Sequence, residues 1–228
     1  MTKTTERPMI FNGEMVRAIL DGRKTQTRRV MKTQPEPSKT REGDYWFPSK
    51  KLECMVHVSD IVPCNSPIAD CHLFFQEHCC PFGAAGDRIW VRETWAEACA
   101  GAPELQLYRA NYPTHVPSHY ENVPPAEEIR WTPSIHMPRW ASRILLEITD
   151  VRVERLNAIS QANAIAEGAP PSHPSIDCVS QEYGFPDFSR SWFGQTWQHI
   201  YGEGSWQANP WVWVIEFKRI EGNSHATN

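Results

Sequence analysis

A short basic stretch, residues 22–29 with the sequence GRKTQTRR, gathers side-chain types that bind anions and exchange protons. Arg23, Arg28 and Arg29 are natural partners for a phosphate group or a base edge, because a guanidinium donates hydrogen bonds in a planar fork. Lysine and threonine lie between these arginines. The stretch could instead be a basic surface patch, or a helix end followed by a strand. These alternatives are open from the local sequence alone.

A second dense segment, residues 131–143 with the sequence WTPSIHMPRWASR, lies between two proline-rich turns and the start of a strand. Trp140 could stack on a base, and His136 could act as an acid, a base or a hydrogen-bond donor. Arg139 is a further candidate for ligand binding. An equally good interpretation is a rigid loop whose tryptophan closes the end of a barrel.

Two short strand-like segments carry candidates of the same kind. Arg92 and Glu93 lie in GDRIWVRETW (86–95), and Tyr108 and Arg109 lie in LQLYRA (105–110). A charged pair on a core strand often points into a pocket at a barrel mouth. A cross-strand ion pair is the simpler alternative.

Cysteine and histidine residues gather between positions 54 and 80, which is enough ligand chemistry for a zinc site. Their spacing is irregular and includes no CxxC pair, so the metal signal is weak. We therefore expect reduced thiols, no metal and no cofactor. The weak metal candidates are Cys71, His72, His78, Cys79 and Cys80.

The composition is that of a water-soluble globular protein, with 40% hydrophobic and 22% charged residues among 228. No run of about 18 apolar residues occurs, so we expect no membrane span. The first residues lack the apolar stretch of a signal peptide, which predicts a cytoplasmic protein with reduced cysteines. Residues 1–41 carry ten Lys/Arg and four Asp/Glu, although the net charge of the whole chain is −4. That asymmetry is compatible with a polyanionic or nucleotide ligand, but the charge alone favours the simpler interpretation, a solvated basic face.

Hydrophobic periodicity predicts a mixed α+β fold. Eleven of the nineteen prolines lie in 35–67 and 113–138, which favours long irregular insertions at about 33–82 and 111–138 and a loop at about 170–188. Strands so widely separated in sequence suggest one domain, 1–228, built on a closed or nearly closed barrel. The strands are expected at 8–11, 24–31, 86–95, 105–110, 143–156 and 210–220, and the helices at 13–22, 157–168 (capped by Asn157) and 191–202.

Several of these segments together resemble an ASCH domain, a family of PUA-like β-barrel folds. They are GRKTQTRR after a short helix, GDRIWVRETW, AIAEG after the long strand, and the final strand VIEFKRI. Longer stretches, such as CPFGAAGDRIWVRETW and PSIHMPRWASRILLEITDVRVERL, resemble a phage- and prophage-borne branch of that family. The resemblance covers nearly the whole chain except 33–78, 111–129 and 170–188. It implies a PUA-like (ASCH) β-barrel with short flanking helices and two long loop insertions.

The resemblance also implies a catalytic set. Small bacterial ASCH proteins with a similar core include amidohydrolases that remove the acetyl group from N4-acetylcytidine. Their catalytic lysine, threonine and glutamate match Lys24, Thr27 and Glu167 here, and Glu167 keeps the spacing of eleven residues from Leu156. The implied ligand is a nucleoside or RNA, and protein partners are not predicted.

Amide hydrolysis needs a nucleophile, a group that takes its proton and a group that protonates the leaving nitrogen. A neutral lysine can activate a threonine hydroxyl if burial lowers the lysine pKa. On a regular strand, however, Lys24 and Thr27 would point to opposite faces. They can converge only if the chain turns between them. The alternatives are an RNA- or modified-nucleotide-binding PUA-like module without catalysis, and a metal-independent ribonuclease that uses Lys24 with His136 or Glu167.

Overall fold

The computed structural model describes residues 4–62, 71–98, 104–171, 175–184 and 186–220. It confirms the α+β class. The main sheet has five strands in the order β1-β6-β9-β10-β2, and only β1 and β6 run parallel. The bounds of these strands are β1 Glu6–Ile10, β6 Arg88–Arg92, β9 Leu145–Arg155, β10 Trp211–Ile220 and β2 Gln26–Val30.

The predicted barrel is not closed by backbone hydrogen bonds between the described strands. β1 and β2 are the two edge strands, and no ladder joins them. A side chain crosses between them instead: Nη2 of Arg29 on β2 donates to the carbonyl of Ile10 at 2.7 Å. The same guanidinium lies 5.3 Å from the ring centre of Phe11. A register shift between Glu216 and Phe217 interrupts the β9–β10 ladder, which is where a bulge bends paired strands.

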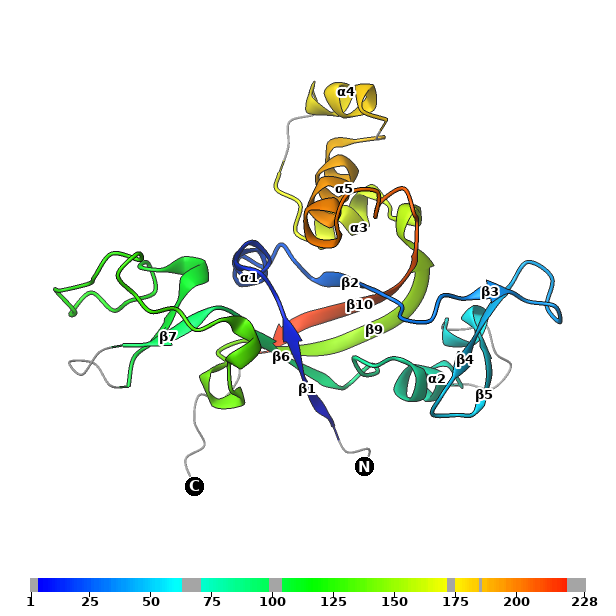
Figure 1. The fold of residues 1–228 in the computed structure, drawn as a ribbon, viewed down its shortest axis with the longest axis horizontal. Helices are drawn as coiled ribbons and strands as arrows, with labels where there is room; N and C mark the ends of the chain where they lie inside the picture. Colours follow the sequence, from blue (N-terminus) through cyan, green and yellow to red (C-terminus); the bar gives the residue numbers. More distant parts are fainter. Residues whose placement is uncertain (1–3, 63–70, 99–103, 172–174, 185, 221–228) are drawn as a thin grey trace.

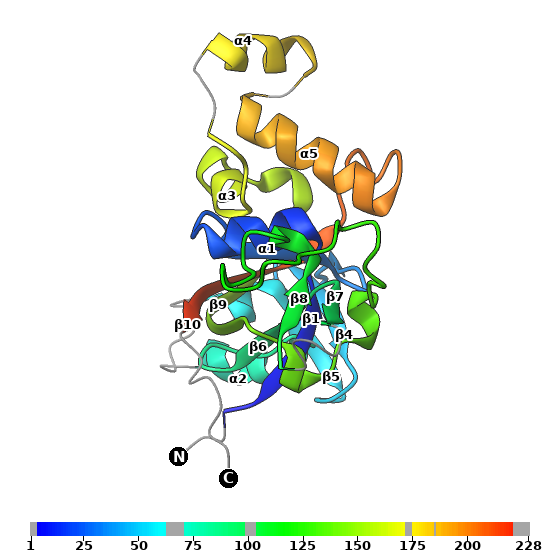
Figure 2. The same ribbon diagram turned by 90° about the vertical axis from the view of Figure 1, so that its left-hand side faces the viewer.

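Successive side chains of β10 point to opposite faces of the sheet, and each face packs into a different apolar core. Trp213 and Ile215 pack on the face shared with β1, β6 and β9. Val212 and Val214 pack on the other face, which is covered by α3 (Gln161–Ala166) and α5 (Phe188–Tyr201). Figures 1 and 2 show α3, α5 and then α4 (Ser175–Glu182) stacked outward from the sheet on this second face.

The segment 33–82, which we expected to be irregular, contains regular structure. Phe47, Val56 and Ile61 are buried in the main core, and Phe47 meets Trp213 edge to face at 6.0 Å. The segment therefore folds because its apolar residues pack on β10. Figure 1 places it at one end of the main sheet. Its elements are β3 Glu36–Pro37, β4 Tyr45–Ser49, β5 Cys54–His57, the 3₁₀ helix η1 Val58–Ile61 and α2 Cys71–Cys79.

The proline-rich segment 111–138 is mostly irregular, in agreement with its composition. It follows the hairpin β7–β8 at the end of the sheet opposite to α2 (Figure 1). The expected loop at 170–188 instead contains α4, and residues 172–174 and 185 lie outside the described structure. The elements here are β7 Trp95–Glu97, β8 Gln106–Tyr108 and the 3₁₀ helices η2 Arg109–Asn111, η3 Ser134–His136 and η4 Arg139–Ala141.

Helix α1 (Gly13–Leu20) begins at Asn12, whose side chain accepts from the Met15 amide, and Gly22 follows it with φ of +74°. The expected cap of α3 was wrong: Ser160, not Asn157, accepts from the first turn. Asn157 lies instead in the 3₁₀ helix η5 (Leu156–Ala158), which separates β9 from α3. Because this 3₁₀ turn occupies the residues just after β9, α3 begins at Gln161 and not at 157, where the sequence pattern predicted it.

Candidate functional site

The chain turns sharply between α1 and β2, and this turn positions Lys24. The Lys24 amide donates to the Ala18 carbonyl, and the Thr25 amide donates to the Ala166 carbonyl, both at 2.9 Å. These two bonds fasten the turn to α1 on one side and to the end of α3 on the other. The strand β2 begins only at Gln26. Lys24 therefore lies in a connection held against α3, and not in the regular strand.

Glu167 meets Lys24 at the C-terminal end of α3. The Lys24 Nζ donates to Glu167 Oε2 at 2.7 Å and to the Glu167 carbonyl at 2.9 Å. Gly168 follows with φ of +104°, and a Cβ at this position would lie 3.0 Å from Ala18 and 3.3 Å from Lys24. Only glycine suits both this conformation and this close approach. Gly168 thus lets the end of α3 come close enough for the lysine–glutamate pair to form.

Arg28 binds the other oxygen of the same carboxylate. Its Nη1 donates to Glu167 Oε1 at 3.1 Å, and its Nη2 donates to Glu154 Oε2 at 3.0 Å. Arg152 then binds Glu154 Oε1 at 2.6 Å. The network runs from the fully buried side chains of Lys24 and Arg28 to the partly exposed Glu154. Each carboxylate oxygen of Glu167 therefore accepts a hydrogen bond from a buried basic side chain, Oε2 from Lys24 and Oε1 from Arg28.

The pKa of Lys24 lies below its ordinary value of 10.5. Burial is the main cause, because the charged ammonium loses its hydration. The neighbouring charges of Arg29 and Arg28 also lower the pKa, and Glu167 opposes the shift. Lys24 is thus a buried amine that releases its proton more readily than a lysine in water.

This shift predicts a stability that depends on pH. Between the lowered pKa and 10.5, the unfolded chain binds more protons than the folded chain, so the free energy of unfolding rises with pH in this window. We expect Lys24→Met to remove this rise, which urea unfolding at several alkaline pH values measures. Cys80 and Tyr108 have the opposite effect above about pH 9: they make the free energy of unfolding fall as the pH rises. They do so in the wild type and in the variant alike, because burial raises the pKa of each to about 12 in the folded chain. A stability difference between wild type and variant that stays constant with pH would contradict the prediction.

Thr27 lies on the other face of β2. It stands opposite Ile215 in the β2–β10 ladder, whereas Arg28 stands opposite Val214. Ile215 belongs to the main core and Val214 to the core under α3 and α5. The Thr27 hydroxyl forms no hydrogen bond with Lys24 or Glu167 in the described structure. The fold thus brings Lys24 and Glu167 together and directs Thr27 elsewhere.

A cavity of ≈ 280 Å³ adjoins the pair. Its lining includes Glu167, Gly168 and Arg23, with Trp192, Phe193 and Thr196 from α5. Arg23 donates to the Gly168 carbonyl at 2.8 Å and pairs with Asp21 at 3.0 Å. The volume suits a single base or a small nucleoside, and the lining includes aromatic, acidic and basic residues. Lys24, Thr27 and Arg28 do not line it.

Glu93 and Tyr108 belong to a second, separate cluster. Glu93 is 2% exposed and receives two hydrogen bonds from Arg143, at 2.9 and 3.0 Å. Arg143 also binds the side chain of Asn111 and lies 4.0 Å from the Tyr108 ring centre. Arg143 was not among the sequence candidates, although its place before an alternating strand marks it as a possible partner for Glu93. None of these residues lines the Glu167 cavity.

The remaining candidates are spread over the surface near β1 and β6. The Arg92 guanidinium donates to the Ile135 carbonyl, Arg139 pairs with Glu6 at 3.0 Å, and the exposed Trp140 lies edge to face on Trp95. Arg109 and His136 are exposed. Arg29 bridges the two edge strands, as described above. The structure does not gather this set into one site with Lys24.

The cysteine- and histidine-rich segment shows no metal-binding group of three ligands among the described residues, and residues 63–70, with Cys64, lie outside them. His78 stacks on Phe74, and the Cys79 thiol donates to Ser49 at 3.6 Å. Cys80 is buried. Cys71 and His72 begin α2 and are half-buried.

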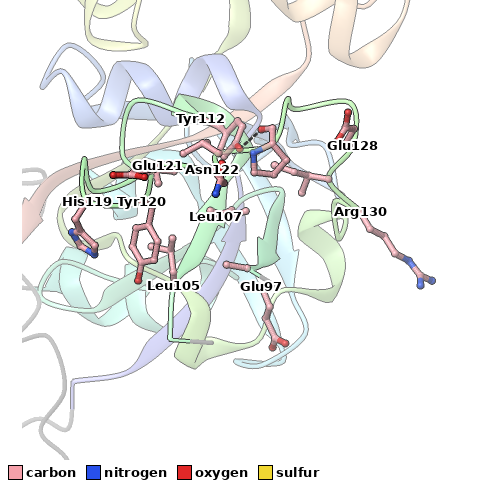
Figure 3. Close-up of a pocket in the computed structure, with 15 residues that line it drawn as sticks. Glu97, Leu105, Leu107, Tyr112, His119, Tyr120, Glu121, Asn122, Glu128 and Arg130 are labelled. Carbon is pink, nitrogen blue, oxygen red and sulfur yellow. Dashed lines mark hydrogen bonds between the residues drawn. The ribbon is translucent and has the colours of Figure 1, made fainter. Parts of the chain in front are cut away.

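A larger cavity, ≈ 590 Å³, lies elsewhere, beside the β7–β8 hairpin (Figure 3). Leu105 and Leu107 lie among its lining residues, and the Tyr112 hydroxyl donates to the Pro124 carbonyl. In Figure 3 the charged end of Arg130 extends away from this group. No candidate residue from the sequence lines this cavity. Its size alone does not make it the site.

No protein-family model, no curated protein and no solved structure matched the chain. Within the described residues, no helix has the length and apolar character needed to cross a membrane.

Proposed function

We propose that the chain is an amidohydrolase that acts on an acylated nucleoside or base of the N4-acetylcytidine type, on a PUA-like (ASCH) fold. The observation that carries the proposal is the Glu167 carboxylate. Glu167 is among the residues that line a cavity of nucleoside size, and its carboxylate is bound at 2.7 Å to a buried lysine whose pKa is lowered. The bridging of β1 and β2 by Arg29 supports a nearly closed barrel. The free thiols of the described cysteines suit a cytoplasmic protein.

The reaction proceeds by attack of water on the acyl carbon. Glu167 accepts the proton of that water, and the C–N bond breaks as the proton passes to the leaving amine nitrogen, which gives a carboxylic acid and the free amine. Lys24 does not line the cavity, so it acts through Glu167: it fixes one oxygen and can exchange a proton with it. Arg28 fixes the other oxygen. In this proposal Arg23 and Trp192, which line the cavity, bind the base.

Water, and not Thr27, is the nucleophile in this proposal, because Thr27 faces the main core. We expect wild-type protein to convert acetylcytidine to cytidine, which absorbance follows directly. Thr27→Val, which keeps the shape of the side chain, should retain kcat/KM within about tenfold. A loss of more than about 10³-fold with unchanged folding would restore Thr27 as the nucleophile. No turnover by the wild type at micromolar enzyme would overturn the proposal for this substrate.

A binding module without catalysis is the second candidate, and one observation favours it. Both oxygens of Glu167 already accept hydrogen bonds from buried cations, as in a network that only shapes a cavity. In that case cytidine and acetylcytidine would both bind, measured by calorimetry, and neither would be changed. The ribonuclease alternative uses Lys24 with His136 or with Glu167. His136 does not line the Glu167 cavity, so the version that pairs Lys24 with Glu167 is the one the contacts support.

A further inference from the structure

Two cysteines from different elements of the segment 33–82 lie beside one buried serine. Ser49 ends β4 and is the ladder partner of Cys54, the first residue of β5. Partners in an antiparallel ladder point to the same face of the sheet, with their Cβ atoms about 4.5–5.5 Å apart. Cys79, the last residue of α2, contacts the same serine, because its Sγ donates to Ser49 Oγ at 3.6 Å. Cys54 and Cys79 are therefore both neighbours of one small side chain.

The electrostatic environment of Cys79 agrees with this closeness. Burial raises the pKa of the Cys79 thiol above its ordinary value of 9.0. The hydrogen bond with Ser49 opposes the rise, the charge of a Cys54 thiolate adds to it, and Lys51 opposes it. A like charge has such an effect over a short distance. Cys54 is exposed and Cys79 is half-buried, so an oxidant in solution reaches Cys54 first and finds Cys79 close behind it.

The other described cysteines are placed less well for a bond with Cys54. Cys71 begins α2, eight residues before Cys79, which is about 12 Å along the helix axis. Cys80 is 4% exposed and belongs to the main core, where burial raises its pKa to about 12. Cys178 lies on α4, the outermost helix on the other face of the main sheet (Figure 2). Cys54 and Cys79 are thus the described pair that can bond with the smallest movement.

We propose that Cys54 and Cys79 form a redox modification site, at which hydrogen peroxide converts the two thiols into a disulfide. The Cys54 sulfur attacks one peroxide oxygen, the O–O bond breaks, and Cys54 becomes a sulfenic acid while the other oxygen leaves as water with the thiol proton. The Cys79 sulfur then attacks the Cys54 sulfur and displaces hydroxide, which leaves as a second water with the Cys79 proton. Two electrons pass from the thiols to the peroxide, and a dithiol reductant reverses the oxidation.

The disulfide fastens the β4–β5 hairpin to α2 at one end of the main sheet (Figure 1). Ser49 and Cys79 line a cavity of ≈ 460 Å³ beside the end of β2, whereas neither residue lines the Glu167 cavity. The bond therefore forms away from the proposed hydrolase site. The inference concerns the inserted segment and does not depend on whether acetylcytidine is hydrolysed.

The test is peptide mapping of the full chain after treatment with hydrogen peroxide, with the remaining thiols alkylated during denaturation. Trypsin is unsuitable, because no lysine or arginine lies between residues 52 and 87. A protease that cleaves after aspartate and glutamate separates the cysteines of this region into the peptides 54–60, 61–70, 71–77 and 78–87. We expect 54–60 to be joined to 78–87 in the oxidised wild type, and dithiothreitol to separate them.

The variants assign the bond to single sulfur atoms. Cys54→Ser and Cys79→Ser should each abolish the cross-link. Cys80→Ala removes the other thiol of peptide 78–87 and should retain it, as should Cys71→Ser, the matched control on α2. A cross-link that survives Cys79→Ser would overturn the proposal. So would a bond from 54–60 to a different peptide, a disulfide-linked dimer on a non-reducing gel, or the absence of any cross-link.

The Tm of the oxidised protein tests whether the bond forms in the native fold. Oxidation should raise the Tm of the wild type by about 5–10 °C, because a bond between residues 25 positions apart restricts the unfolded chain. Cys54→Ser replaces an exposed side chain and should show no rise after the same treatment. A cross-link without a rise in Tm would mean that the native fold does not hold the two thiols together, and it would also contradict the proposal.

Discussion

We expect Glu167→Gln to lower kcat/KM for the proposed deacetylation of acetylcytidine by about 10²–10⁴-fold, the usual loss when a proton-transfer group is removed. The amide keeps the size of the side chain, and its oxygen can still accept from Lys24. It cannot take a proton from water. Binding of the substrate should change little, so the loss appears in kcat more than in KM. Steady-state absorbance assays on both proteins measure it.

Glu154→Gln is the matched control for this result. Glu154 also accepts from Arg28, at 3.0 Å, but it does not line the Glu167 cavity. Its replacement should keep kcat/KM within about threefold of the wild type, because no reacting atom is touched. Equal losses in the two variants would mean that the charge network as a whole, and not Glu167, supports activity. Retention of wild-type activity by Glu167→Gln would show that another group transfers the proton.

The contact between Lys24 and Glu167 could be expected from the sequence only through the family resemblance. The two residues are 143 positions apart, and nothing in the local pattern connects them. The contact depends on Gly168, where φ is +104° and a Cβ would lie only 3.0 Å from Ala18 and 3.3 Å from Lys24. The alternation of side chains along β2, in contrast, could be predicted from the local sequence, and it places Thr27 and Arg28 on opposite faces of the strand. The structure agrees with that alternation, which is why the predicted threonine role lacks geometric support.

The role of Arg28 and the order in the insertion could not be read from the sequence. Arg28 looked like a ligand for phosphate, but it binds Glu154, and that pairing depends on which strands flank β10. The segment 33–82 looked irregular because of its prolines. Its strands are stabilised by the contact of Phe47 with Trp213, 166 residues away in the chain. Both features arise from tertiary packing, which local composition does not encode.

We expect Glu167→Leu to lower the free energy of unfolding by about 3–5 kcal/mol, the range for removal of one member of a buried ion pair. Lys24 and Arg28, whose side chains have no exposed surface, then lose their shared carboxylate. Addition of Lys24→Met should restore about 1–3 kcal/mol, because the double variant no longer buries an unpaired amine and fills the space with apolar atoms. Urea unfolding of the wild type, both single variants and the double variant gives the coupling energy.

The surface pair Lys218–Glu147 is the control, since its Nζ–O distance is also 2.7 Å. Its lysine side chain is 60% exposed, whereas that of Lys24 is fully buried. Lys218→Met and Glu147→Leu should couple by less than about 1 kcal/mol, because water screens the charges. If the buried pair couples as weakly as this one, Lys24 and Glu167 do not act as a unit. If Glu167→Leu/Lys24→Met is as stable as the wild type but inactive, apolar residues stabilise the fold as well as the Lys24–Glu167 pair does. The pair then contributes to the reaction and not to stability.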